Sequence, residues 1–281
     1  MSKRDYMGHD FESRRMPEFW ASAAGTKALI IAMIVIHVVV GIVASSSFSA
    51  GQWIREYLYL NPQVALKKLF LWQLVTAGFL HAAGIWHLFW NCLILWWFGK
   101  MVEGHLGTKR FVQFFVATIV AGSLAFILEA VVFDKKTPTL GASGAVNGVI
   151  VYAACLYPSR EILVFFVLRM QLWVMAVLMV TADLIMLTQL PGGVAYSAHL
   201  GGAAFGFLFY RYGAKFGRVF DKIDEMAEER KRKQAAKVHQ EEAEMRAELD
   251  RILDKVNNEG MTSLSEQERK FLKEASDRLR G

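Results

Sequence analysis

The sequence predicts an all-α polytopic membrane protein with six transmembrane helices and a helical tail outside the membrane. Three observations support this fold class. The chain has 281 residues with a mean hydropathy of +0.28 and 54% hydrophobic residues, which does not suit an ordinary soluble protein. Six apolar stretches lie between residues 28 and 210. Beyond residue 213 the composition changes abruptly to one that is dense in both charges and poor in large apolar side chains.

The six apolar stretches have the length, or nearly the length, that a helix needs to cross the hydrocarbon core, about 20 residues. The first is not followed by the small-residue cleavage site of a signal peptide, so we interpret it as a span. The fourth and sixth contain or adjoin polar side chains, and their place in a membrane therefore depends on being surrounded by other helices. The predicted spans cover residues 28–44, 85–100, 111–133, 144–157, 172–189 and 195–210.

Lysine and arginine in the connecting segments predict which side of the membrane the chain ends face. These residues gather before the first span, after the second, between the fourth and fifth, and after the sixth, whereas the opposite side has fewer of them. Cytoplasmic loops typically carry such an excess. We therefore expect an integral membrane protein with cytoplasmic N- and C-termini, and the expected location is the bacterial inner (cytoplasmic) membrane.

The part of the chain up to residue 213 is expected to contain two regions. Residues 1–26 form a cytoplasmic N-terminal segment, and residues 27–213 form the six-helix membrane domain. The first loop of that domain, about 48–80, is long and rich in tryptophan and tyrosine, the residue types that settle at headgroup depth. We expect this loop to be associated with the membrane.

The tail is expected to contain a stalk and a hairpin. Residues 214–246 form a charged stalk, either a solvated helix or a disordered linker. Residues 247–281 form a cytoplasmic helical hairpin, because Gly260 is placed to end one helix and Ser265 with Glu268 makes a capping box that opens another. Nothing in this sequence identifies the partner of the tail.

Charge and cysteine content exclude several kinds of function. The net charge of +6 is largely accounted for by charges that flank the spans, so nucleic-acid binding is not expected. Cys92 and Cys155 both fall inside predicted spans without other metal-ligating side chains beside them. The sequence therefore predicts neither a disulfide framework nor a metal site.

A few polar side chains inside or beside the spans carry the functional prediction. An ionised side chain at a helix centre costs about 2.5 to 3.5 kcal/mol on insertion scales, so such residues usually have a task. A structural hydrogen bond explains any one of them alone. Together they supply a nucleophile, a base and side-chain donors, which are the groups that acyl transfer needs. They are His87, Asn91, Ser143, Asn147, Asp183 and His199.

Ser143 has the surroundings that a nucleophilic serine requires. A serine hydroxyl attacks a carbonyl when a base takes its proton, and His199 is the candidate base. Small residues spaced along both helices would let the fourth and sixth spans pack closely enough for the two side chains to meet. The small residues concerned are Gly141, Gly144, Gly202 and Gly206.

Two kinds of donor are available to stabilise an oxyanion beside Ser143. A serine at a helix N-terminus lies near backbone N–H groups that have no partner within the helix. His87 and Asn91 lie one turn apart on the second span and are candidates for further donors.

Four short motifs occur in order along the membrane domain: "FLHAAGIWHLFWN", "FGKMVEGHLG", "GASGA" and "AHLGGAAFG". In these motifs, over about residues 70–210, the chain resembles the rhomboid family of intramembrane serine proteases. The resemblance implies a six-helix bundle, a Ser143–His199 catalytic dyad without a third acidic member, and His87 and Asn91 around the oxyanion. It also implies membrane-spanning protein substrates, cleavage within the lipid bilayer near its outer edge, and no cofactor or metal.

The chain departs from the family pattern at one position beside the dyad. Many rhomboids have an aromatic residue one turn after the serine, where its ring packs against the histidine, whereas this chain has Asn147 there. Asn147 is expected either to hydrogen-bond His199 or a water and fix the imidazole tautomer, or to leave room for another aromatic ring. Asp183 is not needed by a dyad and is expected to tie the fifth helix to a neighbour.

Two functions follow from these residues. The first is an intramembrane serine protease; the second is a catalytically silent rhomboid-like protein that binds and escorts membrane proteins. Inactive relatives typically lack the serine or the histidine, and this chain has both, which favours the protease. A transporter is not expected, because the inverted repeats and broken helices of such proteins are missing from the sequence.

Overall fold

The computed structural model describes residues 23–164, 167–189, 194–260 and 263–280. The chain forms two compact units, Met1–Gly213 and Ala214–Gly281. Most of the segment expected at residues 1–26 lies outside the described residues.

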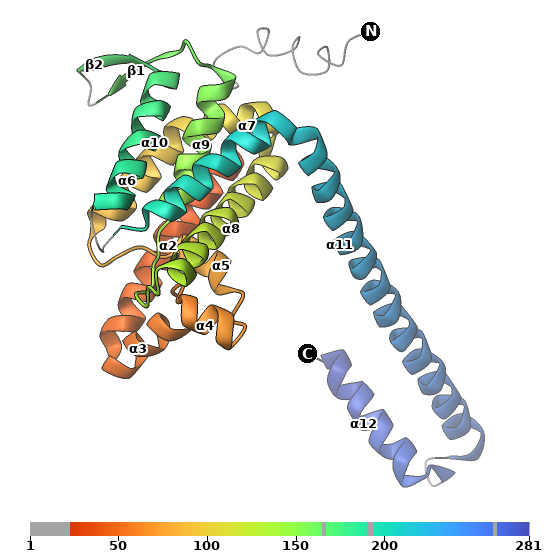
Figure 1. The fold of residues 1–281 in the computed structure, drawn as a ribbon. Coiled ribbons are helices and arrows are strands. Elements are labelled where there is room, and N and C mark those ends of the chain that lie inside the picture. The colour runs from red at the N-terminus through yellow and green to blue at the C-terminus, as the bar shows by residue number, and fades with distance from the viewer. Residues whose placement is uncertain (1–22, 165–166, 190–193, 261–262, 281) are drawn as a thin grey trace, which may run out of the picture. The chain divides into compact units, whose positions relative to one another are not determined.

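Unit 1 is built from helices that run alongside one another (Figure 1). Among the described residues, α2 and α8 are long and apolar enough to cross a membrane, and α9 and α10 are shorter apolar helices. The helix that begins with α6 continues through a π-helical segment, Leu95–Gly99, into α7. The main helices are α2 (Ala24–Ser46), α6 (Ile85–Ile94), α7 (Lys100–Leu106), α8 (Thr108–Val132), α9 (Ser143–Leu156), α10 (Leu172–Gln189) and the first part of α11 (Tyr196–Glu259).

The surface of unit 1 exposes many large apolar side chains. Ile42 on α2 and Leu128 on α8 are each 65% exposed, and α10 exposes further valine, leucine and isoleucine side chains. An exposed apolar surface of this extent is not stable in water and marks contact with a membrane or another protein. The carboxylates on the same helices, Glu129 on α8 and Asp183 on α10, are buried.

A buried carboxylate fixes the start of α2. Glu103 on α7 accepts hydrogen bonds from the backbone N–H groups of Gly25 and Thr26, each at 2.8 Å, and from the Thr26 hydroxyl at 2.7 Å. Thr108 at the start of α8 donates at 2.7 Å to the Oε1 of the same carboxylate, the oxygen that also accepts from Gly25. The first N–H groups of a helix have no partner within it and favour negative charge, so Glu103 joins three helices at one point.

The first loop folds into short helices held by polar and aromatic contacts. The Gln73 side chain is fully buried, accepts from the Asn61 N–H at 3.1 Å and donates to the Glu56 carbonyl at 2.7 Å. Four aromatic rings stack in sequence, with centroid separations of 5.0, 5.4 and 4.3 Å, and they belong to Trp53, Tyr57, Phe70 and Trp72. The elements are α3 (Phe48–Tyr57), α4 (Pro62–Lys67), α5 (Gln73–Thr76) and a 3₁₀ turn, Ala77–Phe79.

A β-hairpin between α9 and α10 departs from the all-α expectation. Strand β1 (Glu161–Val164) pairs antiparallel with β2 (Leu168–Gln171), with Glu161 opposite Gln171 and Val164 opposite Leu168. The sequence analysis treated this segment as a connecting loop. The β-branched Ile162 and Val164 favour strand over helix, and pairing satisfies backbone groups that a loop would leave open.

Unit 2 is a helical hairpin. Beyond Tyr212, where the backbone leaves helical values (φ −125°, ψ 23°), α11 continues to Glu259, so the expected stalk is helical. Gly260, with a φ of +82°, follows the end of α11, and α12 covers Glu266–Arg280. The capping box is present, because the Ser265 N–H donates to Glu268 at 2.8 Å and the Glu268 N–H donates to the Ser265 hydroxyl at 3.2 Å.

The hairpin of unit 2 is expected to loosen at low pH through Glu268. The backbone N–H of Ser265 and the side chains of Lys255 and Arg251 lower the pKa of Glu268 to about 2. Because the ordinary glutamate pKa is about 4.3, the stabilisation is complete above that value and is lost as the pH falls towards 2. Glu268→Gln should therefore increase amide exchange in the first turns of α12 at pH 6, and the difference from the parent should disappear near pH 2.

Hydrogen exchange of the full-length protein, corrected for intrinsic rates, measures this effect. Glu266→Gln is the matched control, because it removes a charge from the same turn and leaves the Ser265–Glu268 bonds in place. Equal protection in the parent and Glu268→Gln at pH 6 would contradict the assignment.

Candidate active site

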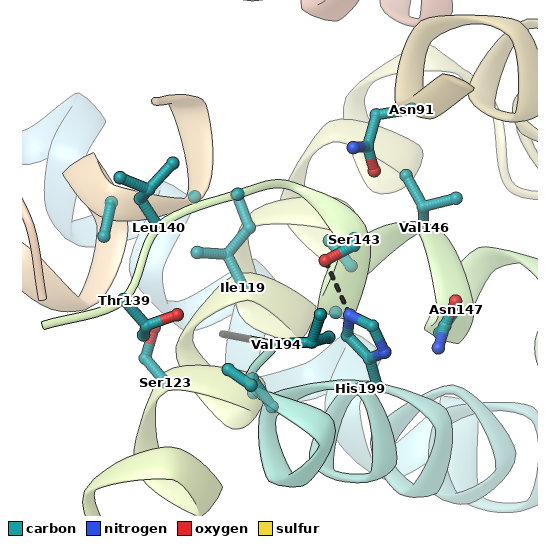
Figure 2. A pocket seen from close by; sticks show the side chains of 18 of the residues that line it. Asn91, Ile119, Ser123, Thr139, Leu140, Ser143, Val146, Asn147, Val194 and His199 are labelled. Atoms are coloured by element: carbon teal, nitrogen blue, oxygen red, sulfur yellow. Dashed lines mark hydrogen bonds between the residues drawn. The ribbon is translucent and has the colours of Figure 1, made fainter. Parts of the chain in front are cut away.

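Ser143 and His199 meet across two helices (Figure 2). Ser143 is the first residue of α9, and His199 lies in the first turn of α11. The Ser143 Oγ and the His199 Nε2 are 2.7 Å apart, which is hydrogen-bond distance. A serine hydroxyl that bonds to an imidazole nitrogen has the geometry in which the histidine can accept its proton.

Glycine residues bring α9 and α11 to this distance. A Cβ atom at Gly144 would lie 2.8 Å from the Ala198 carbonyl oxygen. On the facing helix, a Cβ at Gly202 would collide with the Gly144 carbonyl, and one at Gly206 with the Gly148 carbonyl. The two backbones therefore touch with no side chains between them, as small residues allow in membrane helices.

Gly141, two residues before Ser143, lies close to both the His87 ring and the serine hydroxyl. Gly141 has a φ of +127°, a backbone conformation that glycine adopts without strain, and its N–H donates to the Ala77 carbonyl at 2.9 Å. A Cβ at Gly141 would lie 2.9 Å from the His87 Cε1 and 3.7 Å from the Ser143 Oγ. The His87 ring and the serine hydroxyl thus flank one glycine Cα.

Asn91 lies one turn after His87 and is buried. Its Nδ2 donates to the His87 carbonyl oxygen at 2.8 Å, which uses one of the two N–H bonds of the amide. Asn91 also lines the same cavity as Ser143. The structure thus brings His87, Asn91, Ser143 and His199 to the lining of one cavity.

A cavity of about 360 Å³ opens onto the Ser143 hydroxyl. Its polar side includes Ser143, His199, His87, Asn91 and Asn147. Its apolar side comes from α6, α8, α9 and the segment before α11, through Trp90, Ile94, Ile119, Val146 and Val194. In Figure 2, Asn91 and Val146 lie on one side of the serine, and Leu140, Ile119 and Thr139 on the other.

Asp183 is the residue whose contact with the site was not anticipated. Its Oδ1 lies 3.1 Å from the His199 Nδ1, the ring nitrogen that does not face Ser143. The Asn147 Nδ2 donates to the Asp183 Oδ2 at 2.9 Å. Asp183 does tie α10 to its neighbours, as expected, but one of the residues to which it is tied is the histidine itself.

Position 147, which is aromatic in many rhomboids, is occupied in this chain by an asparagine that contacts Asp183. The hydrogen bond of Asn147 goes to Asp183 and not directly to His199. The Tyr196 ring stands edge-on to His199, with centroids 6.0 Å apart and an interplanar angle of 86°. No local sequence pattern indicates the Asn147–Asp183 contact, because it depends on how α10 is rotated about its axis. Tyr196 and His199 are three residues apart on α11, so they are neighbours along one helix.

Comparison with known proteins identifies the fold. A model described as "Rhomboid domain" matches residues 68–216, more than half of the chain. The chain belongs to the rhomboid family. A second model, described as "Family of unknown function (DUF6576)", matches residues 235–278 in unit 2. The rhomboid assignment accounts for the apolar surface of unit 1, because this is a membrane family.

The chain is similar to several rhomboid proteins. It is 29% identical over 216 residues to Rhomboid protein 1, mitochondrial, of Saccharomyces cerevisiae, covering 75% of this chain and 60% of the relative. It is 26% identical over 187 residues to RHOMBOID-like protein 12, mitochondrial, of Arabidopsis thaliana, covering 59% and 55%. It is 42% identical over 77 residues to Rhomboid protease GluP of Bacillus subtilis, covering 27% and 14%. The chain thus spans little more than half the length of the two mitochondrial relatives.

The expected location in a bacterial inner membrane, with cytoplasmic termini, is corrected by this comparison. The relatives that match more than half of this chain are named as mitochondrial proteins. The charge pattern reports only which ends share a side of the membrane, and it carries no information about which membrane that is.

Replacing Gly202 with alanine is expected to separate α9 from α11. The new methyl group would overlap the Gly144 carbonyl, and overpacking of this kind typically costs about 1–3 kcal/mol. Thermal unfolding of the protein in lipid should show a lower midpoint for Gly202→Ala. Gly41→Ala is the control, since nothing lies within 4 Å of a Cβ at that position of α2. Equal midpoints for the two variants would contradict the packing argument.

Proposed function

We propose that this rhomboid-family chain is an intramembrane serine endopeptidase that hydrolyses peptide bonds in or near the transmembrane segments of membrane proteins. The observation that carries the proposal is the 2.7 Å separation of the Ser143 Oγ and the His199 Nε2 at the edge of a cavity. The GluP relative is named a rhomboid protease, which supports the same reaction class.

The proposed reaction begins with proton transfer from the Ser143 hydroxyl to the His199 Nε2. The serine oxygen forms a bond to the substrate carbonyl carbon, and the carbonyl oxygen takes the negative charge. Collapse of this intermediate breaks the C–N bond, and His199 returns the proton to the leaving amine. A water molecule, activated by the same histidine, then hydrolyses the acyl-enzyme and regenerates the serine.

His87, Asn91 and the first N–H groups of α9 are the proposed donors to the oxyanion. His87 and Ser143 flank Gly141, and Asn91 lines the same cavity. Donors held in a site of low dielectric stabilise developing charge strongly, because they need no reorganisation during the reaction.

The proposed architecture is a bundle of six transmembrane helices with a membrane-associated first loop. The spans correspond to α2, the α6–α7 helix, α8, α9, α10 and the first part of α11, and the hairpin of unit 2 lies outside the bilayer. The proposed substrates are membrane-spanning proteins reached through the lipid bilayer, and the reaction uses no cofactor. The names of the mitochondrial relatives favour a mitochondrial membrane.

Cleavage assays with purified protein in lipid test the proposal against the escort alternative. The parent should cut members of a panel of single-span membrane proteins, and Ser143→Ala should bind them without cutting. A fluorophosphonate probe should label the parent at Ser143. Ser123→Ala is a matched control, because that serine lines the same cavity but donates to the Leu74 carbonyl, so it should still be labelled and still cut.

The protease proposal fails if the parent neither cuts nor takes the label. Co-purification of single-span proteins with both the parent and Ser143→Ala would then indicate an escort. His199→Ala should abolish cleavage as Ser143→Ala does, and the two losses should not add, because neither group works without the other.

Asn91→Ala is expected to lower the turnover number with little change in KM. Loss of one oxyanion donor costs about 2.7–4 kcal/mol in the barrier, a fall of about 10²–10³ in kcat. Steady-state kinetics on a cleaved substrate measures this, with Cys92→Ala as the control on the adjacent position of α6. An unchanged kcat would show that Asn91 serves only its bond to the His87 carbonyl.

A further inference from the structure

We propose that Asp183 is a positioning residue for His199 and that Asn147 holds Asp183 in place, so that four side chains form one hydrogen-bonded relay. The proposal rests on the proteolytic function proposed above and adds an acidic member to the expected dyad.

The relay begins and ends on the same helix. Ser143 on α9 contacts the His199 Nε2 at 2.7 Å, and the His199 Nδ1 contacts the Asp183 Oδ1 at 3.1 Å. The Asp183 Oδ2 accepts from the Asn147 Nδ2 at 2.9 Å, and Asn147 lies one turn after Ser143. Three helices, α9, α10 and α11, are therefore joined around the histidine by three hydrogen bonds.

The acidic end of the relay is shielded from solvent. Asp183 is 8% exposed and Asn147 is 9% exposed. A carboxylate without partners would be very costly in such a place. Each carboxylate oxygen has one partner, the imidazole on one side and the amide on the other, so the orientation of the group is defined.

The relay determines which imidazole nitrogen carries the proton. To accept the proton of Ser143, the His199 Nε2 must be unprotonated, and the neutral ring must then carry its hydrogen on Nδ1. That hydrogen needs an acceptor, and the Asp183 Oδ1 is at the right place. After proton transfer, the same carboxylate faces the positively charged imidazolium and stabilises it.

Because Asn147 donates to position 183, the relay requires a carboxylate there and not an amide of the same shape. An Asp183→Asn variant has nearly the same shape, but its side chain has one acceptor and one donor. If Asn147 keeps its parent orientation, with Nδ2 donating to position 183, the new amide nitrogen faces the His199 Nδ1. The His199 Nδ1 then accepts a hydrogen bond from this amide, so the proton of the neutral ring is on Nε2. A protonated Nε2 no longer accepts from Ser143.

The first test is the kinetics of Asp183→Asn. We expect kcat and the rate of fluorophosphonate labelling at Ser143 to fall by up to about 10⁴, the fall seen when the orienting aspartate of a serine protease is replaced by its amide, with little change in KM. A residue that merely tied helices together would tolerate this isosteric change without loss of labelling rate.

The second test is rescue by exchanging the two side chains. In Asn147→Asp/Asp183→Asn the carboxylate at position 147 accepts from the new amide nitrogen, which leaves the amide oxygen facing the His199 Nδ1. The productive tautomer returns with the net charge unchanged. We expect the double variant to recover at least tenfold in labelling rate over Asp183→Asn, while staying below the parent because the charge no longer touches the ring.

Two further variants serve as a control and as a substitute for Asp183→Asn. Glu103→Gln changes another buried carboxylate, which caps α2, and is expected to lower the unfolding midpoint without lowering kcat. If Asp183→Asn fails to fold, Asn147→Ala is measured, because it keeps the carboxylate but frees its second oxygen, and it should lower kcat by a smaller factor.

The outcomes separate this inference from the protease proposal. A parent that is neither labelled nor active overturns both. An active parent with equally active Asp183→Asn, or with an inactive Asp183→Asn that the exchange does not rescue, leaves the protease standing and overturns the role of Asp183.

Discussion

The close contact between α9 and α11 is the constraint on which the rest of unit 1 depends. Gly144 and Gly202 meet with their backbones in contact, so a single methyl group at either position would push the helices apart. A shift of even 1 Å would lengthen the Ser143–His199 hydrogen bond beyond useful distance. The geometry of the site is thus set by the absence of side chains at a few positions.

This close packing also explains how buried polar side chains are accommodated in an apolar molecule. The helices α2, α8 and α10 expose large aliphatic side chains, while Asn147 and Asp183 are buried and bonded to each other. Inside the bundle the dielectric is low, so each of these bonds is stronger than it would be in water and each broken bond is more costly. A polar network with one bond broken would therefore strongly destabilise the bundle. This cost favours the one arrangement of the helices in which every bond is made.

The sequence was sufficient for those features that depend on residue type and spacing. The apolar stretches mark the helices, and the glycines indicate why Ser143 and His199 should meet. The capping box at Ser265 follows a local pattern and is present. The Asp183–His199 contact could not be predicted, because it depends on the rotation of α10 about its own axis, which no nearby residue reveals. The β-hairpin was not predicted, because its segment was treated only as the connection between the fourth and fifth spans.

The carboxylate of Glu103 has a consequence for the biogenesis of the protein. It caps the first N–H groups of α2 from a position 78 residues later in the chain. Domains are synthesised from the N-terminus at about 5–20 residues per second, so α2 emerges several seconds before its cap exists. During that interval the first N–H groups of α2 lack the acceptors that Glu103 supplies, and they gain them only when α7 arrives. The register of α2 is thus fixed by a residue that is synthesised after α2 itself is complete.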